Sequence, residues 1–226
     1  MKVFPTCLFA PNGTDAYIER RVISGGTAIN GDETLIETSG GGRVALELSD
    51  FDLDDPEVAR AWDAIDAYMD GGVRPMIVPW CDPAHQPSYH FDGVPHSDDT
   101  SFSDGTLYHT GGTSVSLSAD VALGATILQI DITLLKGNPL GWFSINHDVI
   151  GHRAYKVAEI LAQTDTTATI SVRPRLRRAT SAGATLDFEK PRCVMRIVGE
   201  MRAPRTMGYA EGQPLRFVEY PTGSYE

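Results

Sequence analysis

"VAEILAQTDTTATISV", residues 157–172, holds two apolar runs on either side of the polar turn "QTDT". After the turn, Ala168, Ile170 and Val172 alternate with polar residues, which is the period of a strand with one buried face. The segment therefore predicts a β-hairpin, and a hairpin at this point favours a protein built mainly of strands.

Short strands are predicted on both sides of this hairpin. Apolar and polar residues alternate over short distances, and turn residues separate the runs at the spacing of a small barrel or sandwich. The predicted strands lie within residues 113–131, 142–146 and 184–188. We interpret residues 113–190 as one compact β module.

Longer strands are predicted before and after that module. In "RVALELSDF", residues 43–51, Val44, Leu46 and Leu48 alternate with polar residues as in a half-buried strand. The other predicted strands are residues 15–24, 33–39, 73–80, 192–201 and 213–220. Because an insertion is tolerated where chain ends meet in one sheet, we predict a discontinuous domain of residues 1–112 and 191–226, interrupted by residues 113–190.

One segment clearly predicts a helix, "DDPEVARAWDAIDAYMDGG", residues 54–72. Four of its apolar residues follow the spacing i, i+4, i+7, i+11 and share one face: Val58, Trp62, Ile65 and Met69. Asp54 or Asp55 is placed to cap the free amides of the first turn, and the glycines of "DGG" to end the helix in a left-handed conformation. We expect the helix to dock through its apolar face.

The charge of the chain excludes several classes of partner. Its 226 residues carry a formal charge of -11 at pH 7, so the surface repels nucleic acid, whose nonspecific binding depends on lysine and arginine. No apolar stretch approaches the ~20 residues of a membrane helix, and the first residues lack the pattern of a signal peptide. Three scattered cysteines, Cys7, Cys81 and Cys193, favour free thiols in a reducing cytosol over a disulfide framework.

Residues 80–105, "WCDPAHQPSYHFDGVPHSDDTSFSDG", combine one cysteine, three histidines and five aspartates, and so raise the question of a metal site. Prolines prevent a helix that would align the ligands. Neither a tight local ligand pair nor the spacing of a calcium-binding loop is present. We predict an extended surface loop that binds no stoichiometric metal.

Ser144 and His147, in "FSINHDVIGHR", are the residues that most suggest a hydrolase. A serine nucleophile needs a strained turn and oxyanion donors, and the neighbours Phe143 and Ile145 supply neither. We predict that Ser144 points outward from a strand and that His147 and Asp148 are turn residues. The chain is then not an enzyme and needs no cofactor.

"RPRLRR", residues 173–178, is the strongest basic cluster. On a strand, Arg173, Arg175 and Arg177 would project from one face and meet carboxylates or phosphates of a partner. The alternative is an edge strand whose charges protect it against aggregation.

The order of several short segments resembles that in small tail proteins of tailed bacteriophages and prophages. These segments are "ISGG", "GGGR", "DGGVRPMIVP", "GVPHSDDTSFSDG", "RPRLRRATSAGATLDFEKPRCVMRI" and "FVEY". The resemblance spans almost the full chain. It is strongest to the distal tail protein of long, flexible-tailed phages, and the chain is also similar to tail proteins of gene transfer agents.

The resemblance implies a fold class and a place in the virion. The fold would be mainly β, with a β-sandwich or split-barrel ring domain, one amphipathic helix, and an inserted small β-barrel or sandwich domain facing outward. A homo-hexameric ring would join the tail tube protein to the tail-tip or hub proteins and surround the channel for DNA. Such a protein is assembled in the host cytoplasm, without a cofactor or membrane insertion. The acidic charge agrees with this role, because an acidic lumen lets DNA pass without binding it.

In such a ring, the loop of residues 80–105 is a candidate contact between subunits. Its candidate contact residues are His85, His90, His96, Asp98, Asp99 and Asp104. An alternative function is a carbohydrate-binding adhesion module of the baseplate, with Trp142 and Tyr155 as exposed aromatics on which sugars stack. Residues 113–190 are short, however, for a galectin-like domain with a sugar site.

Overall fold

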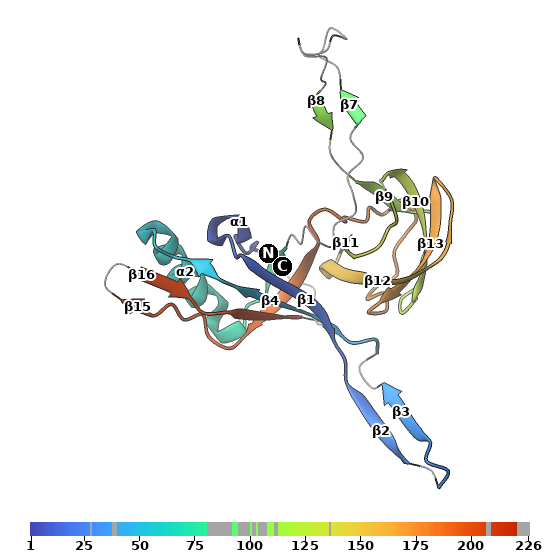
Figure 1. The fold of residues 1–226 in the computed structure, drawn as a ribbon, viewed down its shortest axis with the longest axis horizontal. Helices are drawn as coiled ribbons and strands as arrows, with labels where there is room; N and C mark the ends of the chain where they lie inside the picture. Colours follow the sequence, from blue (N-terminus) through green and yellow to red (C-terminus); the bar gives the residue numbers. More distant parts are fainter. Residues whose placement is uncertain are drawn as a thin grey trace.

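The computed structural model of the chain is mainly β (Figure 1). It describes residues 1–27, 29–37, 40–80, 92–94, 100, 103, 108–110, 113–135, 137–206 and 209–220. Strands account for 49% and helices for 12% of the structure, so the prediction of a mainly β protein is confirmed. The strands form antiparallel sheets and a half-barrel.

One five-stranded sheet has the order β1-β4-β17-β14-β6. Its strands are β1 (Gly13–Glu19), β4 (Arg43–Ser49), β6 (Met76–Pro79), β14 (Arg192–Val198) and β17 (Leu215–Glu219). Leu46 lies opposite Phe217, and Leu48 lies opposite Leu215. The predicted alternation in β4 is confirmed, because Val44, Leu46 and Leu48 are all buried. The late strand β17 thus lies at the centre of a sheet whose first strands come from the start of the chain.

A second five-stranded sheet has the order β11-β12-β13-β10-β9. Its strands are β9 (Ser114–Leu117), β10 (Ile127–Leu134), β11 (Trp142–His147), β12 (Gly151–Gln163) and β13 (Thr167–Arg173). The predicted hairpin of residues 157–172 is confirmed as β12 and β13, with Ile160 opposite Ile170. Thr164 closes its turn, because its hydroxyl lies 2.7 Å from that of Thr167 and its amide donates to the Thr167 carbonyl oxygen.

Three smaller groups of strands lie outside these two sheets in the part of the chain that the structure describes. They comprise β2 (Val22–Thr27) with β3 (Glu33–Glu37), β7 (Asp92–Val94) with β8 (Tyr108–Thr110), and β16 (Tyr209–Gly212) with both β15 (Arg205–Thr206) and β5 (Phe51–Asp52). In Figure 1, the β2–β3 hairpin projects from the ends of β1 and β4, away from the two large sheets. Residues 15–24, predicted as one strand, are two, since β1 ends at Glu19 and β2 begins at Val22.

The predicted helix forms as α2 (Pro56–Met69), and Asp55 caps it by accepting a hydrogen bond from the Glu57 amide at 2.7 Å. A left-handed residue ends the helix, but it is not one of the predicted glycines. This residue is Asp70, with a φ of 48°, and the glycines follow in the short 3₁₀ helix η1 (Asp70–Gly72). The one-turn helix α1 (Thr6–Phe9) is too short for residue spacing to predict it.

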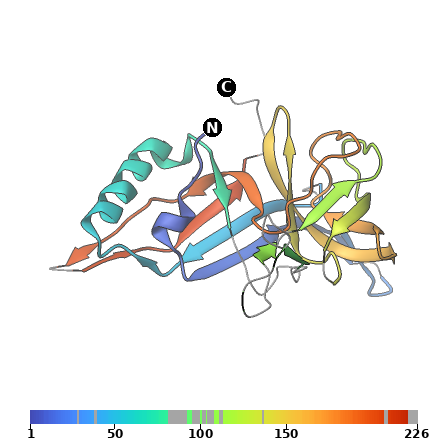
Figure 2. The same ribbon diagram turned by 90° about the horizontal axis from the view of Figure 1, so that it is seen from above.

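Two clusters of buried apolar side chains stabilise the fold. One cluster joins α1 and α2 to the sheet that contains β4 and β17. The other cluster is formed by buried side chains of the sheet that contains β12 and β13 and of the segments packed on it. Trp142 and Ala154 come from the second sheet but belong to the first cluster, where Trp142 meets Trp80 edge to face at a centroid distance of 6.0 Å. The two sheets are therefore packed against each other. Figure 2 shows α2 and the second sheet at opposite ends of the molecule.

We expect Trp62→Ala to destabilise the protein by ~3–5 kcal/mol, because the fully buried ring leaves a cavity when it is removed. The ring contacts Phe9 and Phe51 at centroid distances of 5.2 and 4.9 Å. Denaturant unfolding followed by circular dichroism measures the loss. The control is Arg60→Ala on the exposed side of α2, which should change the stability by less than ~0.5 kcal/mol. Equal unfolding midpoints for the two variants would contradict docking through Trp62.

Candidate functional site

The candidate contact residues of the predicted loop lie outside the described residues. Its six candidate residues are His85, His90, His96, Asp98, Asp99 and Asp104. Their role as subunit contacts, and the absence of a metal from this loop, remain predictions. Elsewhere, within the described ranges, no group of three or more His, Cys, Asp and Glu side chains is arranged to hold a metal ion. No helix in those ranges is long and apolar enough to cross a membrane.

The basic cluster does not form a strand with one charged face, so that prediction is wrong. β13 ends at Arg173, and from Pro174 onward the chain has left the sheet. Arg173 donates to the carbonyl oxygen of the residue before it, and the exposed Arg175 lies against Gly40. Arg177 is turned inward. A strand would have aligned these side chains, whereas the irregular segment that follows β13 lets them diverge.

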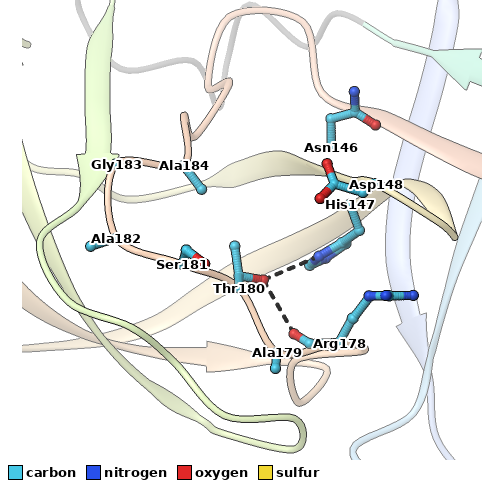
Figure 3. A pocket seen from close by; sticks show the side chains of 10 residues that line it. All are labelled: Asn146, His147, Asp148, Arg178, Ala179, Thr180, Ser181, Ala182, Gly183 and Ala184. Atoms are coloured by element: carbon cyan, nitrogen blue, oxygen red, sulfur yellow. Dashed lines mark hydrogen bonds between the residues drawn. The ribbon is translucent and has the colours of Figure 1, made fainter.

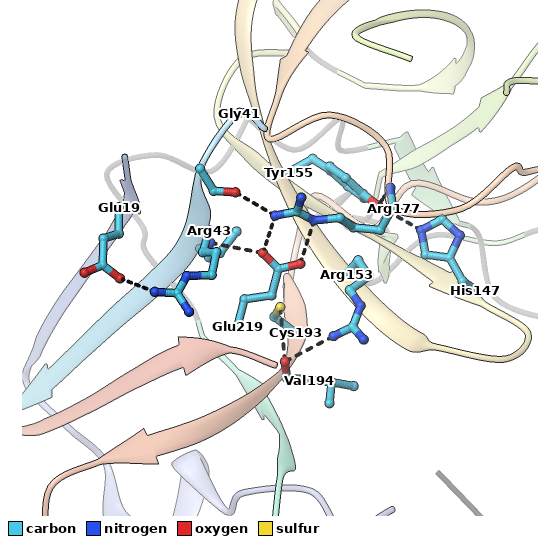
Figure 4. Close-up of polar contacts among 12 residues, drawn as sticks. Glu19, Gly41, Arg43, His147, Arg153, Tyr155, Arg177, Cys193, Val194 and Glu219 are labelled. Atoms are coloured by element: carbon cyan, nitrogen blue, oxygen red, sulfur yellow. Dashed lines mark hydrogen bonds and ion pairs between the residues drawn. The ribbon is translucent and has the colours of Figure 1, made fainter. Parts of the chain in front are cut away.

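Arg177 forms an ion pair with Glu219, whose side chain is fully buried (Figure 4). Arg177 Nε donates to Oε1 at 2.9 Å and Nη2 to Oε2 at 2.8 Å, so the contact is bidentate. Nη2 also donates to the carbonyl oxygen of Gly42, and the Val44 amide donates to Glu219 Oε2. The pair thus ties the segment after β13 to β17 and to the start of β4.

Arg153 makes another polar contact between the two sheets (Figure 4). It is fully buried on β12, and its Nη1 donates to the carbonyl oxygen of Val194 on β14 at 3.2 Å. The next residue along β14 toward the N-terminus, Cys193, is a buried free thiol, and burial raises its pKa to about 12. Cys7 is also free, so both cysteines in the described ranges agree with the expectation of free thiols.

A chain of hydrogen bonds holds His147 at the end of β11 (Figures 3 and 4). The Arg177 amide donates to the Tyr155 hydroxyl, whose own proton is then directed to His147 Nε2, 2.9 Å away. Because Nε2 accepts, the ring proton lies on Nδ1, 3.2 Å from the Thr180 hydroxyl. Thr180 donates in turn to the carbonyl oxygen of Arg178. The chain therefore selects one tautomer of a neutral imidazole.

The surroundings of His147 keep its imidazole neutral. Burial lowers the pKa of His147 from 6.5 to about 4, and the positive charges of Arg153 and Arg178 add to this effect. Burial also raises the pKa of Tyr155, so its hydroxyl keeps the proton that it donates. A general base must reach the proton that it removes, and both nitrogens of this ring already have partners.

Ser144 is buried, so the prediction that it points outward is wrong. Its amide and its carbonyl oxygen both bond to Asp187 at 2.9 Å, which shows that the segment around Asp187 pairs with the exposed edge of β11. Ser144 Oγ has no hydrogen-bond partner among the described residues, and His147 is a strand residue rather than a turn residue. The hydrolase hypothesis therefore lacks the contact between nucleophile and base that it requires.

Trp142 and Tyr155 are also buried, so their interpretation as exposed aromatics is wrong. Trp142 packs on Trp80 where the two sheets meet, and Tyr155 packs on Phe143 at a centroid distance of 5.7 Å. Sugars stack on accessible ring faces, and these rings are covered by protein. The carbohydrate alternative is left without the observation that motivated it.

A hollow of about 300 Å³ lies beside His147 (Figure 3). Residues 146–148 form one side of it and residues 178–184 the other. The exposed side chains of Asp148 and Arg178 bring opposite charges to its rim, and its described lining contains no Phe, Tyr or Trp. The hollow is a small polar recess without the aromatic platform of a sugar site.

The β2–β3 hairpin, residues 22–37, is called the arm below, and it exposes apolar side chains on both faces. Ile23 lies opposite Ile36 on one face, and Leu35 lies opposite Ser24 on the other. Ile23, Ile36 and Leu35 are 49%, 53% and 64% exposed. A two-stranded hairpin is marginally stable in water by itself, so the arm has the character of a binding surface. Sequence reasoning predicted its strands but not their exposure.

Comparison with known proteins assigns no family. No family model matches the chain, and no curated protein matches it. The geometry of the arm and of the ion pair at its base is then what indicates a function.

Glu219→Gln should cost ~3–5 kcal/mol of stability, because it leaves the guanidinium of Arg177 largely buried without a counter-charge. Denaturant unfolding at neutral pH measures the effect. Glu200→Gln is the matched control, since the Glu200–Arg202 pair is exposed and such pairs contribute ~0–1 kcal/mol. Similar losses in the two variants would show that the buried pair does not join the sheets.

Acidification should weaken the fold through His147. The unfolded chain binds a proton at His147 below pH 6.5, whereas the folded protein binds it only near pH 4. The stabilisation present above pH 6.5 is therefore lost as the pH falls toward about 4, by up to ~3 kcal/mol. Unfolding midpoints of the wild type and of His147→Gln, measured across this range, isolate the effect. If both proteins lose the same stability, the titration of His147 is not the cause.

Proposed function

We propose that this chain is a structural virion protein, the distal tail protein of a bacteriophage or related particle. Six copies form a ring around the DNA channel and join the tail tube to the tail tip. The observation that carries the proposal is the arm, whose apolar side chains are exposed on both faces and need a partner.

The direction of the arm supports a ring. In Figure 1 the arm points away from its own two large sheets, so its own subunit does not cover it. An arm that docks on a different surface of the next copy makes a heterologous contact, and such contacts produce a ring when the rotation closes. The resemblance of the sequence to distal tail proteins makes six the expected number of copies.

The two sheets support a division of each subunit into two domains. We assign residues 1–112 and 191–226 to a ring domain of the sandwich or split-barrel type, and residues 113–190 to an inserted outer β domain. In support, the sheet with β17 takes strands from both ends of the chain, whereas the sheet with β12 uses only residues 114–173.

The acidic charge supports a passage for DNA rather than a binding site. Each copy carries a formal charge of -11, so a ring surrounds its channel with a repulsive potential. Few lysine or arginine side chains are then available to replace the counterions of the DNA phosphates, so DNA passes without binding.

Ile23→Ser combined with Ile36→Ser should abolish ring formation while each subunit stays folded, because both side chains are exposed in the subunit. Electron microscopy and analytical ultracentrifugation of the purified proteins detect rings, and circular dichroism checks the fold. Leu123→Ser is the control. It removes an apolar side chain that is 68% exposed in the proposed outer domain, and it should leave the rings intact.

Two outcomes would contradict the proposal. One is a double variant that still forms rings as the wild type does. The other is a wild-type chain that is monomeric, trimeric or part of a peripheral fibre in a reconstruction of its particle.

A further inference from the structure

We infer that the arm of one copy docks on the N-terminal patch of the next copy. The patch consists of Met1, Lys2, Val3, Tyr68, Val73 and Arg74. This inference rests on the proposed ring and names the surface that the arm contacts within it.

The patch joins the start of the chain to the end of α2. The Ile77 amide donates to the carbonyl oxygen of Lys2, and Val3 pairs with Ile77 in a parallel bridge, so the first residues run along β6. Lys2 Nζ and the Arg74 guanidinium lie 4.1 and 5.6 Å from the centre of the Tyr68 ring. One aromatic ring thus holds two exposed cations in place.

Exposed apolar residues adjoin these cations along the chain. Met1 and Val3 flank Lys2, Val73 precedes Arg74, and the three are 48%, 54% and 72% exposed. Exposed apolar groups near fixed charges are typical of a surface that another protein covers. The patch therefore offers both apolar area and positive charge.

The arm offers apolar area with the opposite charge. Asp32 precedes β3 and Glu33 begins it, and both side chains are exposed next to the exposed Leu35. Contact between arm and patch would remove apolar surface from water on both sides and place carboxylates near cations, which favours this partner over others.

The basic cluster of residues 173–178 has two of its four arginines engaged within its own chain. Arg177 is engaged with Glu219, and Arg175 lies against Gly40 at the base of the arm on the same chain. The chain carries a net negative charge, since 30 acidic residues outnumber 19 basic ones. An acidic arm is repelled by such a net charge, and the patch is a place where it is attracted.

The positions of arm and patch make the contact intermolecular. Figure 1 shows the N-terminus at the middle of the molecule, whereas the arm extends far from it, and Figure 2 agrees. When one arm docks on the next copy, the arm of that copy stays free for a third. The contact is thus heterologous and repeats until the ring closes.

Cysteine cross-linking tests the contact. Leu35→Cys in the arm and Val73→Cys in the patch are combined in a background with Cys7→Ser and Cys81→Ser, and the protein is treated with a short bismaleimide. We expect a ladder of covalent oligomers that ends at six, because each copy is linked to two neighbours. Each single-cysteine variant should give no ladder. Covalent dimers from Leu35→Cys alone would show arms meeting each other and would overturn the docking.

Charge reversal tests the complementarity. Rings should be lost in Asp32→Lys/Glu33→Lys and in Lys2→Glu/Arg74→Glu, and the combination of all four changes should restore them. Thermal unfolding confirms that each variant is folded. Rings that survive both reversals overturn the docking but leave the proposed ring intact. A wild-type protein without rings, both purified and in its particle, overturns the ring itself.

Discussion

The ion pair between Arg177 and Glu219 is the interaction on which the arrangement of the two sheets depends. Removing a carboxylate from water is costly unless its oxygens find donors inside the protein. The Glu219 carboxylate accepts from Arg177 Nε and Nη2 and from the Val44 amide, so its burial is compensated. These contacts, together with the packing of Trp142 on Trp80, join a sheet built from distant parts of the chain to one built from consecutive residues.

The same pair fixes the base of the arm. Gly42 leads from the arm into β4, and its carbonyl oxygen accepts from Arg177. Gly41, with a φ of 96°, packs so closely that a Cβ there would lie 3.0 Å from the Arg175 backbone nitrogen. Only glycine combines this conformation with this approach. In the proposed assembly, a base held in this way would orient the arm in advance and so reduce the entropy lost on binding.

Charge and apolar exposure act together in the proposed assembly. Acidic groups keep copies apart in most relative orientations, since like charges repel. Where an acidic apolar arm meets a basic apolar patch, the repulsion is replaced by attraction and apolar surface is buried. Specificity then comes both from attraction at the contact between arm and patch and from repulsion in the other relative orientations of two copies. The chain of hydrogen bonds around His147 is not part of the proposed contact between copies and contributes to the stability of the second sheet.

The sequence by itself determined the local elements of this protein. The hairpin of residues 157–172 and the buried face of α2 with Trp62 follow from residues within a few positions of one another, which is the range of strand and helix periodicity. Only the tertiary structure decided which surfaces are covered. Ser144 is buried by a segment that pairs with it from elsewhere in the chain. Arg177 turns inward to pair with Glu219, which lies 42 residues further along the sequence and outside the range of any local pattern. The arm carries apolar strand residues such as Ile23, Leu35 and Ile36, and yet they stay exposed, because burial depends on what packs against a face, and no local pattern records that.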